Sequence, residues 1–362
     1  MEVNGKERIL LALSCRQPDR VPVIESIDKP AARALARLLH IEVPHPEGPG
    51  SNASIPFEDA ELLCLVAERL DLDGLRITGS DHAFDGMLPG ESRQDRYGRT
   101  FVKKDGRLWQ TEGPIKTEAD LQGYDMASKL VPEDFDEVRY IIDRIGKEKA
   151  CFLRLPDPVH LGWQLRGGLS ELMPDFVLNP SLVHGIMRVT TDYIKAVISM
   201  TAAMNVEFFN MAGDLADERS TLMSPRHYRH FVKPYQKEIV EHVHDLGLKV
   251  MKHTDGNVSA ILDDFVEVGF DGFHPVQPQC MDIQEVKQRL TGRLCVIGNI
   301  DCRFLLPFGS PEEVVESVKD TLAKAAPGGG YILCSSNSLH DYCKAENFVA
   351  MVQATHTYGV YQ

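Results

Sequence analysis

The sequence predicts an α/β protein in which eight strands form a (β/α)8 barrel. Short runs rich in Val, Ile, Leu and Phe recur along the 362 residues, and segments with helical period lie between many of them. Continuous apolar strands that alternate with helices indicate parallel pairing beneath a cover of helices. Eight such units fit a closed barrel, while a doubly wound sheet stays possible because sequence alone does not show closure. The expected strands span residues 21–25, 73–78, 151–155, 206–211, 248–253, 271–276, 294–298 and 331–335.

The expected helices carry start and stop signals in the sequence. Ser310 and Glu313 form a capping box with proline at the first helical position, and Ser224 precedes a proline in the same way. Gly247 and Gly269 follow helical segments just before expected strands, where glycine readily ends a helix. The clearest helical periods cover residues 58–70, 133–145, 225–247 and 311–325.

Length and composition are compatible with one domain. Apolar residues make up 43% and charged residues 25% of the chain, which are ordinary values for a globular protein. We predict a single barrel domain over residues 1–362, with a helical extension at 1–20 and an insertion at about 79–130 between the second and third strands. Within the insertion, residues 96–113 have the pattern of a hairpin that turns at Asp105-Gly106.

Charge and hydropathy exclude several classes of partner. The 39 Lys and Arg residues against 53 Asp and Glu residues give a net charge of −14, which repels the phosphate backbone of nucleic acids. The N-terminus is too polar for a signal peptide, and no run approaches the roughly 18 apolar residues of a membrane span. We expect a cytoplasmic protein, bound neither to nucleic acid nor to membrane, whose eight scattered cysteines are reduced thiols.

Polar residues follow nearly every expected strand. In a parallel barrel the catalytic groups lie at the carboxyl ends of the strands, because apolar side chains fill the interior. Some of these residue types also cap helices, and buried histidine and cysteine are often core residues, so position alone leaves both roles open. The polar residues just beyond the strands include Glu25, Asp81, Asp157, Asp214, His253, Asp255, His274, Gln277, Asn299, Asp301, Cys334 and Asn337.

His253 and Asp255 stand out because they occur together at one strand end. Residues two apart on a strand share a face, so this pair can direct two metal ligands, or a base and its orienting carboxylate, at one pocket. The alternative is that Asp255 caps the following helix while His253 packs beneath the loop.

Four segments of the chain form a set: RQPDRVPV (16–23), SPRHYRHFVKPYQKEIVEHVHDLGLKVMKHTDGN (224–257), GFDGFHPVQP (269–278), and PGGGYILCSSNS with AENFVAM (327–351). Together they resemble the uroporphyrinogen decarboxylase superfamily, most strongly in the C-terminal half. The resemblance extends over most of the chain and implies a TIM-type barrel. It does not by itself select one of the reactions that the superfamily catalyses.

The decarboxylase branch is the second choice among these reactions. That branch carries an R-Q-A-G-R segment whose arginines bind substrate carboxylates, and the matching region here, residues 25–38, lacks it. Asp81 resembles the aspartate that this branch uses on pyrrole nitrogens. A polycarboxylate without an arginine cluster would be held poorly by a protein of charge −14.

The other large branch contains zinc-dependent, corrinoid-linked methyltransferases, in which an H-x-C pair and a cysteine after the last strand bind the metal. His253 matches the histidine, and Asp255 stands where the first cysteine would be. Asn337, or the nearby Cys334, stands at the position of the second cysteine. The resemblance implies His253, Asp255 and Cys334 as zinc ligands.

Ligands of imidazole and carboxylate leave zinc harder than thiolates do, which favours an oxygen-bound methyl group. The resemblance then implies an O-demethylase component that transfers a methyl group, with a methoxyaromatic compound as the expected donor, to the Co(I) corrinoid of a partner protein. A homodimer is possible by analogy, and a barrel that binds its ligand without transforming it is a third hypothesis. The expected catalytic residues are Asp81, Asp214 and His253, and the expected substrate-binding residues are Trp163, His274, Gln277 and Asn337.

Overall fold

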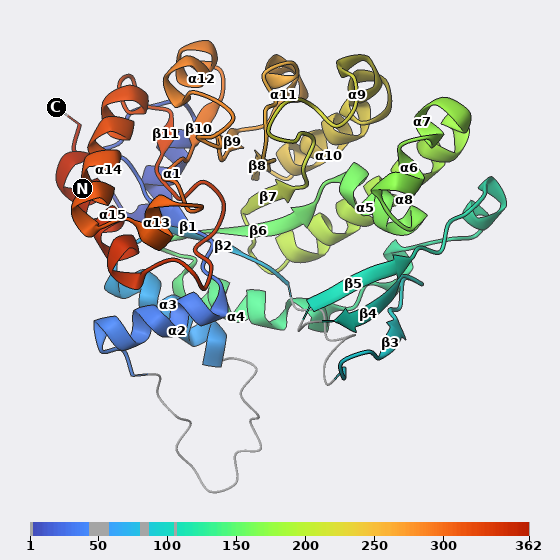
Figure 1. Cartoon of the computed structure of the whole chain (residues 1–362), viewed down its shortest axis with the longest axis horizontal. Helices are drawn as coiled ribbons and strands as arrows, with labels where there is room; N and C mark the ends of the chain where they lie inside the picture. Colours follow the sequence, from blue (N-terminus) through green and yellow to red (C-terminus); the bar gives the residue numbers. More distant parts are fainter. Residues whose placement is uncertain (1–2, 43–57, 80–86, 105–106, 362) are drawn as a thin grey trace, which may run out of the picture.

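Eight parallel strands form the central sheet of the computed structural model, which describes residues 3–42, 58–79, 87–104 and 107–361 (Figure 1). Parallel bridges from Val23 to Leu333 and from Ile27 to Leu339 join the last strand to the first, so the sheet closes into a barrel. The predicted (β/α)8 fold is therefore confirmed. In the order of the sheet, the strands are β1 (Ile24–Glu25), β2 (Gly74–Ile77), β6 (Ala150–Pro156), β7 (Phe208–Ala212), β8 (Lys249–His253), β9 (Gly272–His274), β10 (Cys295–Ile297) and β11 (Tyr331–Ile332).

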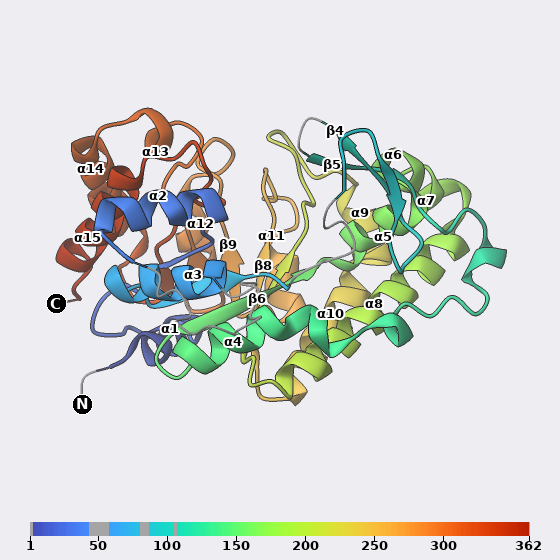
Figure 2. The ribbon, with the colours of Figure 1, turned by 90° about the horizontal axis from the view of Figure 1, so that it is seen from below.

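Helices surround this sheet, as the two perpendicular views show (Figures 1 and 2). The segment predicted as one helix over residues 225–247 is two helices, because Pro234 has no N–H to donate and the chain bends at Val232. Among the described residues of the expected extension at 1–20, only α1 (Gly5–Leu13) is an α-helix. The others are α2 (Lys29–Leu39), α3 (Glu58–Arg69), α4 (Asp136–Ile145), α5 (Pro158–Arg166), α6 (Leu169–Leu172), α7 (Asp175–Leu178), α8 (Pro180–Ala202), α9 (Pro225–Phe231), α10 (Lys233–Asp245), α11 (Leu262–Val268), α12 (Ile283–Leu290), α13 (Leu305–Phe308), α14 (Pro311–Ala325) and α15 (Ala345–Tyr358). Of the helices in the described part of the chain, none combines the length and the apolar character needed to cross a bilayer.

The barrel interior is apolar towards the amino ends of the strands and polar towards their carboxyl ends. Successive side chains of a strand point to opposite faces of the sheet. Residues two apart therefore share a face, so Arg154 follows Phe152, and His253 follows Met251, on the inward face. The polar side chains thus lie above an apolar layer, at the mouth of the barrel. That layer, which includes residues from α1, consists of Ile9, Ala12, Leu13, Ile24, Ala150, Phe152, Phe208, Met251, Cys295, Ile297, Ile332 and Cys334.

A small antiparallel sheet lies between β2 and β6 in the chain. It consists of β3 (Ser92–Gln94), β4 (Thr100–Lys104) and β5 (Arg107–Glu112), and the expected turn at residues 105–106 lies outside the described residues. The end of β5 runs close to the end of α5, since a Cβ added at Gly113 would lie 2.2 Å from the carbonyl oxygen of Leu165. The Tyr97 ring packs edge-on against Tyr193 of α8, at 5.5 Å between centroids. The small sheet is therefore anchored on α5 and α8, beside the barrel mouth (Figure 2).

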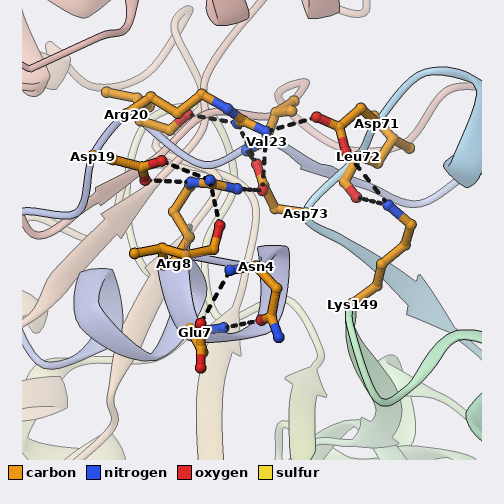
Figure 3. A network of polar contacts seen from close by, with 12 residues as sticks. Asn4, Glu7, Arg8, Asp19, Arg20, Val23, Asp71, Leu72, Asp73 and Lys149 are labelled. Carbon is orange, nitrogen blue, oxygen red and sulfur yellow. Dashed lines mark hydrogen bonds and ion pairs between the residues drawn. The ribbon is translucent and has the colours of Figure 1, made fainter. Parts of the chain in front are cut away.

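A charged network at the amino end of the barrel joins α1, the segment before β1 and the start of β2 (Figure 3). Asp73, whose side chain is 1% exposed, accepts hydrogen bonds from Arg8, from Arg20 at 2.6 Å and from the backbone N–H of Val23 at 2.8 Å. Arg8 also pairs with Asp19 at 2.6 Å, and this hydrogen bond lowers the pKa of the Asp19 carboxyl. One buried carboxylate therefore compensates two arginines.

We expect Asp73→Asn to destabilise the protein by about 3–5 kcal/mol, because it leaves the charges of Arg8 and Arg20 without their shared buried partner. Asp71→Asn is the matched control, since Asp71 contacts Arg20 at 3.2 Å with a side chain that is 73% exposed. The control should cost less than about 1 kcal/mol. Urea denaturation of the three proteins measures both effects, and equal losses for the two variants would contradict this account.

Candidate metal and substrate site at the barrel mouth

Three potential metal ligands meet where β7 and β8 end. The ligand atoms of Asp214, His253 and Asp255 lie within 4.8 Å of one another. Asp214 follows β7 and His253 ends β8, and these parallel strands pair Ala212 with His253, so their carboxyl ends lie side by side. The structure thus joins Asp214 to the pair that the sequence singles out. We call these three residues the mouth triad.

The carboxylate of Asp255 is held at one oxygen and unpartnered at the other. Its Oδ2 accepts a hydrogen bond from Asn337 Nδ2 at 2.6 Å. Its Oδ1 is buried, lies 4.0 Å from His253 Nε2 and has no hydrogen-bond partner among the described residues. Burial, together with the negative charge of Asp214, raises the pKa of Asp255 to about 7. An unpartnered carboxylate oxygen beside an imidazole is a position that a cation would satisfy.

The orientation of His253 follows from the groups behind it. His253 Nδ1 lies 2.7 Å from His274 Nδ1, which also lies 3.3 Å from the Arg76 guanidinium. Arginine only donates, so His274 Nδ1 is an acceptor and His253 must donate its Nδ1 hydrogen to it. Burial lowers the pKa of both imidazoles well below the ordinary value, which keeps both neutral. The lone pair of His253 is therefore on Nε2, the atom that faces Asp255.

His274, which the sequence predicts to bind substrate, contacts His253 and Arg76 instead of lining either of the cavities described below. Its side chain is fully buried behind His253. Arg76, which the sequence analysis missed, holds His274 and contacts Glu25 Oε1 at 3.3 Å and the carbonyl of Asn337. Asn337 in turn orients Asp255. A charged residue within the apolar run 73–78 was the available sequence signal for Arg76.

Two other predicted substrate-binding residues are engaged elsewhere. Gln277 Oε1 accepts the backbone N–H of Gly256 at 2.9 Å, which fixes the loop after Asp255. Trp163 lies on α5, where its ring packs against His160 at 4.4 Å between centroids. Neither side chain lines the two mouth cavities described below.

Cys334, which the sequence predicts as a metal ligand, is not a member of the mouth triad. The thiol is fully buried in the apolar layer of the barrel and donates to the carbonyl of Ser335 at 3.1 Å. Burial raises the pKa of the thiol, whereas zinc binds the thiolate. Asn337 is the residue that reaches the triad from beyond β11. Asp81 lies outside the described residues.

A buried lysine, also missed from the sequence, supports the triad from behind. Lys252 is fully buried and forms an ion pair of 2.7 Å with the fully buried Asp157. Its ammonium also donates to the carbonyls of Gly213 at 2.9 Å and His253 at 3.0 Å. Asp157 also caps α5 through the N–H of Val159. Lys252 therefore ties together the two strand ends that carry the mouth triad.

Two cavities open at this end of the barrel and share a wall. The first, of about 340 Å³, is lined by residues that include Arg76, Arg154, Asn210, His253 and Asn337. The second, of about 250 Å³, lies beside the small sheet and is lined by residues that include Tyr97, Met126, Phe135 and Tyr193. Thr78 and Arg154 line both cavities. The mouth thus offers a polar compartment, with His253 of the triad on its wall, next to a more aromatic one.

We expect Asp255→Asn to change how the stability of the metal-free protein depends on pH. The carboxyl has a pKa of about 7 when folded, against about 4 when unfolded, so it stabilises the fold below about pH 4. That contribution is lost as the pH rises through about 7. Between about pH 4 and 8.5, wild type should lose roughly 2–4 kcal/mol more than the variant, by urea denaturation in EDTA. Identical pH profiles would contradict the raised pKa.

Comparisons with known proteins agree with this architecture. The methyltransferase MtaA of Methanosarcina barkeri, described as a methylcobamide:CoM methyltransferase, is 23% identical over 358 residues and covers 99% of both chains. MtbA of Methanosarcina acetivorans, of the same description, is 22% identical and covers 91% of this chain and 94% of its own. A solved methyltransferase structure from Methanosarcina mazei superimposes with a TM-score of 0.75 at 21% identity, over 99% of both chains.

Decarboxylases are also similar, over a shorter part of the chain. Uroporphyrinogen decarboxylase of Hydrogenovibrio crunogenus is 24% identical over 270 residues, which cover 68% of this chain and 72% of its own. The model of the uroporphyrinogen decarboxylase (URO-D) family matches residues 97–358, which is more than two thirds of the chain. The prediction made from the sequence motifs is confirmed: the chain belongs to the uroporphyrinogen decarboxylase family.

Proposed function

We propose that this chain transfers a methyl group from an O-methyl donor to the Co(I) corrinoid of a partner protein, with zinc held by the mouth triad. The main support for this proposal is the buried Oδ1 of Asp255, which has no hydrogen-bond partner among the described residues and lies beside the unprotonated Nε2 of His253. Two carboxylates and one neutral imidazole carry two negative charges, which a divalent cation would neutralise. Burial, and after it repulsion from Asp214, raises the pKa of Asp255, and a bound cation would relieve this repulsion.

The donor set fits a catalytic zinc site. Such sites use three protein ligands and keep one position open for substrate. Asp214, His253 and Asp255 supply three oxygen and nitrogen ligands, and these favour an oxygen substrate over a sulfur one. When bound, zinc would supply Lewis-acid stabilisation of the negative charge that develops on the leaving oxygen.

The chemistry requires the methyl carbon to change partners. The carbon–oxygen bond breaks and its electron pair stays on the oxygen, which later takes up a proton, while the electron pair of Co(I) forms the new bond to carbon. His253 is fixed for ligand binding through His274, and Asp255 is fixed through Asn337. Asp81 remains our candidate for the acid that supplies the proton or anchors the substrate.

The similarity to relatives supports methyl transfer more than decarboxylation. The two methyltransferases align over 91% and 99% of this chain, whereas the decarboxylase aligns over 68%. The segment at residues 25–38 lacks the arginine motif of the decarboxylases. These relatives act on coenzyme M, so the O-methyl donor rests on the ligand chemistry of the mouth triad.

We expect the purified chain to bind about one zinc ion and to methylate Co(I) cobalamin with a methoxyaromatic donor. His253→Ala and Asp255→Asn should abolish stoichiometric zinc binding and lower the transfer rate at least about 100-fold, because the metal contributes several kcal/mol. Asn337→Ala, which removes an orienting contact, should weaken zinc affinity about 10- to 100-fold. Metal analysis and the absorbance change of the corrinoid measure these effects.

Asp245→Asn, an exposed carboxylate at the end of α10, is the control and should behave as wild type. Methyl transfer that survives complete removal of metal would refute the zinc mechanism. Carbon dioxide release from coproporphyrinogen-type substrates would instead identify a decarboxylase. Saturable donor binding without any corrinoid methylation would identify a binding protein.

A further inference from the structure

Four arginines line the two mouth cavities, and three of them already have carboxylate partners. Arg76 contacts Glu25 at 3.3 Å, Arg96 contacts Asp134 at 2.9 Å, and Arg99 contacts Asp95 at 2.6 Å. Arg154 differs, because its guanidinium forms no hydrogen bond or ion pair with any residue in the described part of the chain, and the charge of Asp214 acts on it only from beyond ion-pair distance. A guanidinium always carries its charge, so this charge is available to a ligand.

Arg154 projects from the barrel wall into the space where the ligand must lie. It follows Ala150 and Phe152 on the inward face of β6, where those two residues contribute to the apolar layer. It pairs in register with Asn210 of β7, another residue that lines the first cavity. Its side chain is exposed to solvent, and it lines both cavities.

The chemistry of a guanidinium specifies its partner. Its planar fork of N–H donors matches a carboxylate in a bidentate pair, and in a partly desolvated cavity such a pair is stronger than a neutral hydrogen bond. The first cavity has Arg154 and His253 on its wall, so one small molecule can address both residues. Its volume of about 340 Å³ lies within the usual range for small-molecule sites.

We infer that Arg154 binds a carboxylate of the methyl donor, so that the substrate is an O-methylated carboxylic acid rather than a neutral methyl ether. This inference rests on the proposed function for the methyl group. The methoxy end lies on the side of the mouth triad, and the carboxylate lies at the junction of the cavities. The aromatic walls formed by Tyr97, Phe135 and Tyr193 favour a ring as the body of the molecule.

Binding of 4-methoxybenzoate and of its neutral isostere 4-methoxybenzamide tests this assignment by isothermal titration calorimetry. We expect wild type to prefer the benzoate by about 10- to 100-fold, as a charge-assisted pair predicts. Arg154→Gln should remove that preference, and Arg154→Lys should restore part of it, since lysine keeps the charge without the fork. Arg37→Gln, on the exposed surface of α2, is the control and should keep it.

A benzoate preference that persists in Arg154→Gln, or equal binding of the two probes to wild type, would overturn the inference. Binding of 4-methoxybenzenesulfonate in place of the benzoate, again lost in Arg154→Gln, would overturn the carboxylate and identify a sulfonate site. Circular dichroism of each variant verifies that it is folded. The titrations need neither zinc nor corrinoid and are run with and without zinc, so their failure is distinct from failure of methyl transfer.

Discussion

The ammonium group of Lys252 holds together the two strand ends on which the mouth triad depends. It lies in the fully buried space between β8 and the surrounding helices, where it compensates Asp157 and donates to the carbonyls before Asp214 and at His253. Burying a charge is costly unless it is paired and hydrogen-bonded, and this lysine meets both conditions. The same carboxylate also caps α5 and accepts a hydrogen bond from Gln236 at 2.6 Å. One buried polar network therefore joins the start of α5, the ends of β7 and β8 and the candidate ligands that follow them.

A second chain of contacts sets the chemical state of the site. The charge of Arg76 makes His274 an acceptor, His274 makes His253 a donor at Nδ1, and His253 then presents an unprotonated Nε2. On the other side, Asn337 occupies one oxygen of Asp255 and leaves the second free. The residues around the triad thus select protonation states and orientations that suit a divalent cation. Replacing His274 or Asn337 would therefore change the orientation or protonation state of a ligand without replacing the ligand itself.

The site differs from the thiolate zinc sites of the corrinoid-linked branch in a way that has a chemical consequence. An aspartate replaces the cysteine two residues after His253, and the cysteine nearest to the last strand faces the apolar layer. A second aspartate, from the adjacent strand end, would supply the third ligand of the proposed metal site. Oxygen ligands in place of sulfur would leave the metal more electrophilic. Such a metal can activate a substrate whose leaving group is poorer than a thiolate.

The sequence by itself determined the barrel, because apolar runs of strand length and helical periods are local patterns that can be recognised in the amino-acid sequence alone. It also placed His253 and Asp255 at one strand end, since residues two apart share a face. Only the tertiary structure decided which distant side chains join them. Asp214, Asn337 and Arg76 come from other strand ends, and their contacts depend on strand order and closure of the barrel. The same holds for Cys334, whose thiol lies within the apolar layer below the barrel mouth, a depth that the residue type does not reveal.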